Sequence, residues 1–329
     1  MGILIAGGAG YIGSHVVVAL LKRKEEVVVV DDLSTGHKES VLGGKLYVGD
    51  LKDENFLDRV FSENEIDIVM HFAASSLVNE SVENPLKYYE NNVCGTLSLL
   101  KAMKKHSAKK IVFSSTAAVY GEPERIPIEE GDKIEPKNPY GETKLAIEKI
   151  LKWFDNAYGV KYISLRYFNV AGAIETGEIG EDHSPETHLI PIVLQVALGK
   201  RDSVVIYGDD YPTKDGTPIR DYIHVMDLVD AHVLALAELR KEEKSEIYNL
   251  GNGEGFSVKE VIEVARKVTG HSIPAVFTER RKGDPAILVA SSMKAMEKLG
   301  WEPKYPSLEK TIESAWIWHK NHPNGFRNK

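Results

Sequence analysis

Tyr140 and Lys144 lie four residues apart, and side chains of these types at this spacing could move a proton. A phenol titrates near pH 10 in water, about three units too high for a base at neutral pH, and a nearby cation lowers that pKa. With Lys144 as the cation, Tyr140 could take a hydroxyl proton while a hydride leaves the same carbon atom. The alternative is a packed tyrosine beside a solvated lysine, since Tyr-x-x-x-Lys occurs by chance in many helices.

The residues around this pair predict the helix that positions it. Asn138 is a favourable N-cap, Pro139 suits the first helical position, and Gly159 suits the end of the helix. Between these limits one face is apolar, through Ile147, Ile150, Leu151, Phe154 and Tyr158. Tyr140 and Lys144 are then one turn apart on the same side of the helix.

A glycine-rich turn follows the first apolar segment of the chain. Gly2–Ala6 is expected to form a buried strand, the glycines follow at once, and His15–Leu21 continues as an apolar helix. In this setting the G-x-G-x-x-G spacing of the turn lets a pyrophosphate approach the backbone at the helix N-terminus. A turn that binds nothing is the alternative. The contacts expected with a dinucleotide are Gly7, Gly10, Tyr11, Ile12 and Gly13.

The second expected strand, Glu26–Val30, ends in two aspartates. Asp31 comes about twenty residues after the glycines, where a carboxylate can bond the adenosine ribose hydroxyls. An acid there repels a 2′-phosphate, and the nearest downstream cations, His37 and Lys38, lie beyond the next turn. We therefore expect NAD rather than NADP. The loop contacts expected with NAD are Asp31, Asp32, Leu33, Ser34, Thr35 and Gly36.

Thr116 is a third candidate for the chemistry. It ends the expected strand that begins at Lys110, and ligands of open parallel sheets bind beyond the carboxyl ends of strands. Its hydroxyl could hydrogen-bond the reacting oxygen. For the neighbouring Ser114 and Ser115, hydrogen bonds to the loop backbone are the simpler interpretation.

Strands and helices alternate through the first half of the chain, which predicts an α/β fold with a doubly wound parallel sheet. Beyond about Asn169 a glycine- and acid-rich stretch and shorter elements indicate a smaller C-terminal α/β substrate domain. We expect a dinucleotide-binding domain over residues 1–169 and a substrate domain over 170–329, with a strand near 246–250 returning to the large sheet. The other strands expected for that sheet are Lys45–Val48, Asp67–Phe72, Lys110–Ser114 and Tyr162–Tyr167.

Composition indicates a cytoplasmic enzyme. The 329 residues are 43% hydrophobic, and the net charge of −8 argues against a nucleic-acid surface. The single cysteine, Cys94, rules out an internal disulfide and suits a reducing compartment. We expect no membrane partner, because no apolar segment approaches the length of a membrane span.

Taken together, several segments resemble the extended short-chain dehydrogenase/reductases and, within them, the UDP-glucose 4-epimerases. The resemblance covers nearly the whole chain. It implies that Tyr140 is the base, Lys144 its partner and Thr116 the hydroxyl contact. The matching segments are Gly7–His15, His71–Ala74, Tyr89–Val93, Tyr140–Lys144, Leu165–Asn169, Arg220–Val225 and Arg280–Asp284.

The resemblance also implies binding residues for tightly held NAD and for a UDP-hexose. Its further cofactor contacts are Asp50, Leu51, Phe72, Ala73, Ala74, Ser76, Asn91, Lys144 and Phe168. Its substrate contacts are Thr116, Tyr140, Asn169, His188, Leu189, Tyr207, Arg220, Arg281, Asp284 and Leu288. A guanidinium suits a diphosphate, although ion pairs with Asp221 and Asp284 are the simpler interpretation of Arg220 and Arg281.

The implied reaction removes a proton and a hydride at C4 of the sugar, turns the 4-keto sugar, and returns the hydride to the opposite face. UDP-galactose and UDP-glucose, two sugars of galactose metabolism, interconvert without net oxidation. The resemblance further suggests a homodimer, in which the expected helices Asn84–His106 and Pro139–Tyr158 pair with their copies.

Three positions depart from the family pattern. Thr116 replaces the usual serine, which keeps the hydroxyl but restricts its rotamers. Ser76 stands where some relatives use a lysine on the cofactor. Leu288 is intermediate between the large ring that excludes N-acetylated sugars and the small residue that admits them, so the sequence leaves N-acetylhexosamines open.

Other functions remain to be weighed against the epimerase. A nucleotide-sugar dehydratase or decarboxylase needs a carboxylate directly after the threonine, and this chain has Ala117-Ala118 there. An ordinary NAD-linked dehydrogenase would release NADH. A non-catalytic NAD-binding sensor would have no reason to hold Tyr140, Lys144 and Thr116 together.

Overall fold

The computed structural model describes residues 2–242, 244–281 and 284–327. The chain divides into two compact units and passes between them several times. The first unit comprises Met1–Gly121, Ile134–Arg166 and Val229–Tyr248, and the second comprises Glu122–Lys133, Tyr167–Leu228 and Asn249–Lys329.

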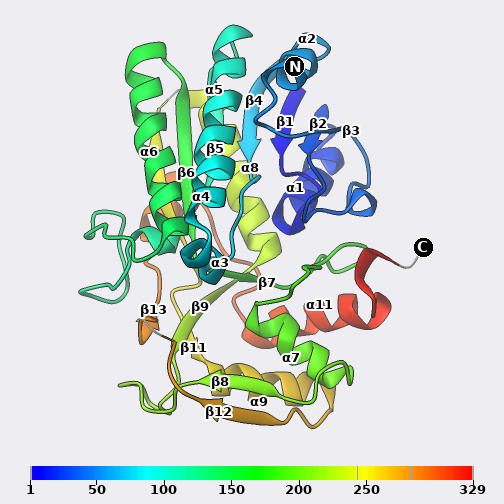
Figure 1. The fold of residues 1–329 in the computed structure, drawn as a ribbon, viewed down its shortest axis with the longest axis vertical. Helices are drawn as coiled ribbons and strands as arrows, with labels where there is room; N and C mark the ends of the chain where they lie inside the picture. The colour runs from blue at the N-terminus through cyan, green and yellow to red at the C-terminus, as the bar shows by residue number, and fades with distance from the viewer. Residues whose placement is uncertain (1, 243, 282–283, 328–329) are drawn as a thin grey trace. The chain divides into compact units, whose positions relative to one another are not determined.

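The first unit is built on a sheet that has seven strands among the described residues, in the order β10-β6-β5-β4-β1-β2-β3 (Figure 1). Pairs β1–β2, β2–β3, β1–β4 and β4–β5 are parallel. The predicted doubly wound sheet is confirmed, and β10 is the expected returning strand. The bounds are β1 Gly2–Ala6, β2 Val27–Asp31, β3 Lys45–Val48, β4 Ile66–His71, β5 Lys110–Thr116, β6 Lys161–Tyr167 and β10 Glu246–Leu250.

Helices cover both faces of this sheet because alternate residues of its buried strands point to opposite sides. One face packs Leu4, Val28, Val69 and Ile111 against helices α2 (Glu54–Ser62), α5 (Gly95–Lys105) and α6 (Pro139–Tyr158). Helix α1 (Tyr11–Lys22) packs on β1 and β2, and α8 (Val225–Glu242) completes the helices that Figure 1 shows around this sheet.

The expected continuous helix from Asn84 to His106 is interrupted. Asn84 caps the short helix α4 (Pro85–Tyr88), the next residues form a π-helical segment, η2 (Tyr89–Cys94), and α5 follows. A π-helical turn holds one residue more than an α-helical turn and occurs often at functional sites. A sequence pattern of apolar residues does not reveal it, because it changes the register without ending the helix.

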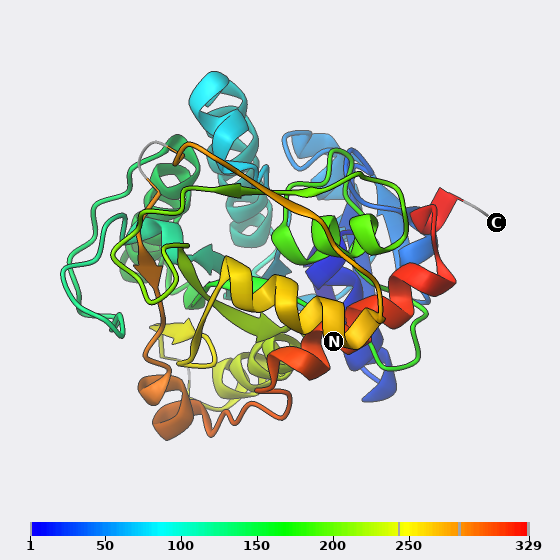
Figure 2. The same cartoon turned by 90° about the horizontal axis from the view of Figure 1, so that it is seen from below.

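The second unit contains smaller sheets. Strand β9 (Ile219–His224) pairs with β7 (Asn169–Ala171), β11 (Gly255–Ser257) and β13 (Ile287–Leu288), and β8 (Val204–Tyr207) pairs with β12 (Ala275–Thr278). Helices α7 (Leu189–Ala197), α9 (Val258–Thr269) and α11 (Leu308–Asn321) contact one another and lie side by side in Figures 1 and 2. Their apolar faces share a core that includes Val193, Ile262 and Ile312.

Shorter segments connect these elements. They are α3 Val78–Glu83 and α10 Met293–Leu299, and the 3-10 turns η1 Lys38–Ser40, η3 Ala117–Val119 and η4 Gly325–Arg327. Within the described ranges, none of the helices combines the length and the apolar character needed to cross a bilayer.

Candidate active site

The glycine turn joins β1 to α1, and each glycine meets a different demand. Gly7 has a φ of +82°, which disfavours any side chain, and a Cβ on Gly13 would lie 2.1 Å from the Gly7 carbonyl oxygen. At Gly10, by contrast, the nearest described atom to such a Cβ is the Gly7 oxygen at 3.5 Å. Protein packing therefore does not require glycine at position 10, whereas close approach of a ligand would.

The N-terminus of α1 offers donors to that ligand. Its N-cap is Gly10, and no side chain in the described part of the chain caps it. The backbone N–H groups of Tyr11, Ile12 and Gly13 lie in the first turn, where the helix dipole favours an anion. The geometry of the turn thus suits the pyrophosphate of a dinucleotide.

Asp31 ties this turn to the end of β2. Its carboxylate accepts hydrogen bonds from the N–H groups of Ala9 and Leu33, each at 2.9 Å. Burial raises the pKa of Asp31, and these two bonds lower it in part. The loop that follows β2 contains the predicted residues Asp32, Leu33, Ser34, Thr35 and Gly36, and the Asp32 carboxylate accepts bonds from the backbone and hydroxyl of Ser34.

The end of β4 is fixed by two asparagines of the π-helical segment. Asn91 donates to the Ser75 hydroxyl at 3.1 Å, and Asn92 accepts from the Ser75 N–H at 2.8 Å. Asn92 also donates to the Thr143 hydroxyl on α6 at 3.1 Å. The sequence predicted Asn91 but missed the bridging role of Asn92, which only the register of the π-helix reveals. The predicted residues Phe72, Ala73, Ala74 and Ser76 lie in this segment after β4, and Asp50 and Leu51 follow β3.

Tyr140, Thr116 and Lys144 come together as predicted. Asn138 caps α6 by accepting from the Gly141 N–H at 2.9 Å, and Gly159 ends the helix in a left-handed conformation. The Thr116 hydroxyl, at the end of β5, lies close enough to the Tyr140 phenol to lower its pKa. The Lys144 ammonium lies 5.9 Å from the centroid of the Tyr140 ring and donates to the Ser114 carbonyl at 2.8 Å.

Burial shifts the pKa values of this group. Burial raises the pKa of the Tyr140 phenol, and the bond from Thr116 lowers it in part. Burial also lowers the pKa of Lys144 to about 7, while the charge of Glu148 raises it. The expected lowering of the Tyr140 pKa by Lys144, helped by the nicotinamide ring, concerns the NAD-bound site and stays a prediction. In the protein alone both groups lose water, and Lys144 is directed to a backbone carbonyl.

A buried ion-pair network lies next to Lys144 and was not predicted. Arg166 on β6 donates to the two carboxylate oxygens of Glu148 at 2.9 and 2.6 Å, and to the Tyr120 hydroxyl at 2.9 Å. The Ser115 hydroxyl also donates to Glu148, at 2.6 Å. Glu148 follows Lys144 by four residues on the same face of α6. A carboxylate at that spacing is the sequence signal that could have indicated a charged group beside Lys144.

Apart from Thr116 and Tyr140, the predicted substrate residues lie in the second unit, several of them around β9. Arg220 on β9 forms an ion pair with Asp284 and donates to the Pro285 carbonyl at 2.8 Å. Leu288 on β13 is the direct register partner of Arg220. Asp221, the other acid considered for Arg220, instead accepts from the N–H groups of Asn252, Gly253 and Ala290.

The remaining predicted residues of the second unit lie at element ends. The Arg281 guanidinium lies 3.9 Å from the centroid of the Tyr207 ring, at the end of β8. His188 is the N-cap of α7, Leu189 is its first residue, and Asn169 begins β7 directly after Phe168. Lys282 and Gly283 of the Arg280–Asp284 motif lie outside the described residues.

Comparison with known proteins places this geometry in a family. The model of the NAD dependent epimerase/dehydratase family matches residues 3–251. The chain belongs to the NAD dependent epimerase/dehydratase family. A curated relative, the UDP-glucose 4-epimerase of Halalkalibacterium halodurans, is 63% identical over 99% of this chain and 98% of its own.

Solved structures agree with this family membership. A crystal structure of a UDP-glucose 4-epimerase has a TM-score of 0.98 at 57% identity and full coverage of both chains. The UDP-glucose 4-epimerase of Bifidobacterium longum, in complex with NAD+ and UDP, has a TM-score of 0.95 at 42% identity, covering 99% of this chain and 100% of its own. The predicted resemblance, α/β fold, enzyme class and NAD cofactor are confirmed.

Proposed function

We propose that this protein interconverts UDP-galactose and UDP-glucose by epimerisation at C4, using tightly bound NAD. The observation that carries the proposal is the joint placement of Tyr140, Thr116 and Lys144 beyond the carboxyl end of β5, in a sheet whose first turn suits a dinucleotide. The relatives named above carry this activity in their names.

Residues of the first unit would hold the cofactor. The first turn of α1 would bind the pyrophosphate, and Asp31 the adenosine ribose. Lys144, Ser76 and Asn91 would contact the cofactor as well. Bound NAD would supply an acceptor and donor for the C4 hydride, and its positive nicotinamide ring would favour the phenolate form of Tyr140.

Tyr140 would hold and move the proton of the sugar 4-hydroxyl. Thr116 would hydrogen-bond the same oxygen and keep it within reach of the phenol. Lys144, with a pKa near neutrality, would stabilise the Tyr140 phenolate that accepts this proton. After the keto sugar has turned, Tyr140 would give the proton back to the 4-oxygen, and return of the hydride to C4 leaves no net oxidation.

Residues of the second unit would hold the nucleotide. Arg220 and Arg281 would pair with the diphosphate, and Asp284 and Tyr207 would contact the uridine part. Asn169, His188 and Leu189 would complete these contacts, and Leu288 would border the sugar. As domains along the chain, we propose residues 1–169 with the returning strand near 246–250 for NAD binding and residues 170–329 for UDP-sugar binding. The compact units differ from these bounds, because the first also includes Val229–Tyr248 and the second includes Glu122–Lys133.

A direct test follows the sugar anomeric protons by NMR. Purified protein is incubated with UDP-galactose, first without and then with added NAD, and UDP-N-acetylglucosamine is run in parallel. Appearance of UDP-glucose without added NAD supports the epimerase with resident cofactor. No conversion under either condition contradicts it, and accumulation of NADH would favour the dehydrogenase instead.

We also propose a homodimer in the cytoplasm. Several large apolar side chains of the first unit are exposed on α3, α4, η2 and α6, elements that contact one another. Trp153 on α6 is the most exposed of these, at 70%. Sedimentation of the wild type and of Trp153→Glu at micromolar concentration tests the proposal. A wild-type monomer contradicts it, whereas a dimer that Trp153→Glu dissociates supports it.

A further inference from the structure

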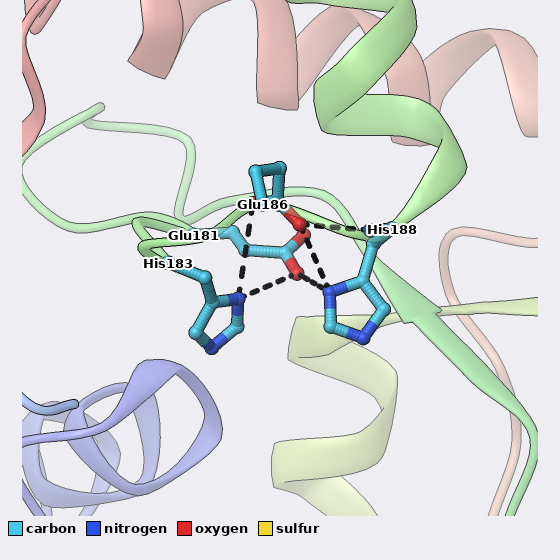
Figure 3. Close-up of side chains that lie close together, drawn as sticks. All are labelled: Glu181, His183, Glu186 and His188. Atoms are coloured by element: carbon cyan, nitrogen blue, oxygen red, sulfur yellow. Dashed lines mark hydrogen bonds and ion pairs between the residues drawn. The ribbon is translucent and has the colours of Figure 1, made fainter. Parts of the chain in front are cut away.

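Two histidines and two glutamates converge in the loop that precedes α7. Glu181, His183, Glu186 and His188 belong to one eight-residue segment, and one ligand atom from each lies within 4.8 Å of the others. Figure 3 shows the four side chains turned toward a common point, with both imidazoles facing carboxylate oxygens. Carboxylates and imidazoles are the side chains that bind divalent transition metals most often outside cysteine sites.

The two imidazoles and the two carboxylates lie within ion-pair distance of one another. The His183 Nδ1 atom lies 3.2 Å from Glu181 Oε1 and 3.8 Å from Glu186 Oε2. The His188 Nδ1 atom lies 2.8 Å from Glu181 Oε1 and 3.2 Å from Glu186 Oε1. Ligands about 2.0–2.1 Å from a zinc ion at tetrahedral angles are about 3.3–3.4 Å apart. The four ligand atoms lie within 4.8 Å of one another, so a central ion would replace the present contacts between imidazole and carboxylate and draw these atoms onto one centre.

The two carboxylates are held in place by their surroundings. The Glu181 and Glu186 side chains are buried, at 5% and 3% exposure. Glu186 Oε1 accepts from the N–H groups of Thr187 and His188, both at 2.8 Å, and the Glu181 carbonyl accepts from the Trp318 indole at 3.1 Å. Outer contacts of this kind orient metal ligands.

The charge balance also suits a divalent cation. Two buried carboxylates carry two negative charges, which one divalent ion balances while both imidazoles stay neutral. Without an ion, two imidazolium rings with centroids 5.3 Å apart would have to supply that charge. Burial lowers the pKa of both imidazoles, but the carboxylates raise it by more. Protonated rings and a divalent ion are therefore alternative ways to balance the same charge, and a bound ion would displace these protons.

We propose that Glu181, His183, Glu186 and His188 form a binding site for a zinc ion that ties the loop to the start of α7. A mixed set of two nitrogens and two oxygens favours zinc over magnesium and calcium, which prefer six or more oxygen ligands. The ion is structural, because all four positions come from protein side chains. The inference does not rest on the proposed function. The cluster uses only the Nδ1 atom of His188, so its contact with the nucleotide would be made through Nε2.

The test uses the full chain with its purification tag removed and EDTA dialysed away. Zinc chloride is titrated by calorimetry, and cobalt chloride is titrated in parallel so that the visible absorption reports coordination geometry. We expect one zinc per chain, a tetrahedral cobalt spectrum, a higher melting temperature with zinc and no comparable effect of magnesium. Binding that is absent, or no tighter than for magnesium, overturns the proposal and leaves an ion-pair cluster.

Variants at His183 separate a ligand from a structural side chain. His183→Gln should weaken zinc binding by more than about 100-fold, because even outer-shell partners are worth about 10–100-fold. His183→Cys should retain tight binding, since a thiolate is a good zinc ligand. His271→Gln, which removes an exposed histidine of the same unit, should bind zinc like the wild type. Equal affinity of His183→Gln and wild type would overturn the site.

Discussion

The proton-transfer residues of the first unit and the nucleotide residues of the second are held in different ways. Tyr140 and Lys144 project from a capped helix of 20 residues, and a buried Arg166–Glu148 pair lies beside them. Arg220, Arg281 and Asp284 lie on short strands and loops, and they contact one another or nearby rings. The proposed proton-transfer residues are thus fixed by regular elements, whereas the predicted nucleotide contacts remain able to exchange partners.

Among variants of the proton-transfer residues in the first unit, Tyr140→Phe should have the largest effect on turnover. Loss of the phenolic hydroxyl should lower kcat by about 10²–10⁴-fold, because no group then carries the proton. Turnover is measured by NMR with UDP-galactose, and circular dichroism checks that the fold is intact. A folded variant that turns over at the wild-type rate would remove Tyr140 from the mechanism.

Arg166→Met tests how much the buried Arg166–Glu148 pair beside helix α6 contributes to the free energy of unfolding. The variant leaves the Glu148 carboxylate buried without its partner, which should lower the free energy of unfolding by about 3–5 kcal/mol. Denaturant unfolding followed by circular dichroism measures it. The double variant Glu148→Leu with Arg166→Met should recover most of this loss of stability. If Arg166→Met alone lowers the free energy of unfolding by no more than the loss of an exposed ion pair does, the buried pair has no stabilising role.

Lys144 should make stability depend on pH. Its pKa is lowered from 10.5 to about 7 by burial, so the folded protein releases a proton that the unfolded chain keeps between these values. Burying the charged form destabilises the protein below pH 7, and the penalty fades as the pH rises toward 10.5. The free energy of unfolding should therefore rise by at most about 1.4 kcal/mol per pH unit.

The slope is assigned to Lys144 by comparison with Lys144→Met. Denaturant unfolding at several pH values from 7 to 9 gives the slope for each protein. The variant should show the smaller slope, because the contributions of all other groups are common to both. Parallel slopes would mean that Lys144 keeps its ordinary pKa in the folded protein.

Arg220→Met tests the second side of the comparison. Loss of a charge-assisted contact to the diphosphate is worth about 1.5–3 kcal/mol, so KM should rise by about 10–100-fold with a smaller change in kcat. Arg280→Met is the matched control, because Arg280 also forms an ion pair, with Asp210, but is not predicted to touch substrate. If both variants raise KM equally, Arg220 has no special role.

Leu288→Ala should change specificity rather than activity. Removing bulk beside the sugar should raise the kcat/KM for UDP-N-acetylglucosamine relative to UDP-galactose by about tenfold, within the range of a few methylene groups. Leu288→Tyr should shift the ratio in the opposite direction. Initial rates with both sugars give the ratio, and no shift in either variant would place Leu288 away from the acetyl group.

The sequence revealed the parts of the site that local patterns determine. Strand, turn and helix signals located the glycine turn and the ends of α6, and the spacing of Tyr140 and Lys144 placed them on one face. The Arg166–Glu148 pair was missed because its partners are 18 residues apart and meet only through the sheet. The sequence also could not show how burial shifts the pKa values of Tyr140 and Lys144, since burial depends on neighbours that are distant in the chain.

The π-helical segment Tyr89–Cys94 makes the structure sensitive to the number of residues between α4 and α5. An α-helix turns by about 100° per residue, so deleting one residue here would restore ordinary spacing and rotate one side of the helix by that angle relative to the other. The Asn92 amide would leave Ser75 and Thr143, and the end of β4 would lose its link to the catalytic helix. A single-residue deletion is harmless in many surface loops. Here it would turn every side chain on one side of the deletion to a new direction and so change several contacts at once.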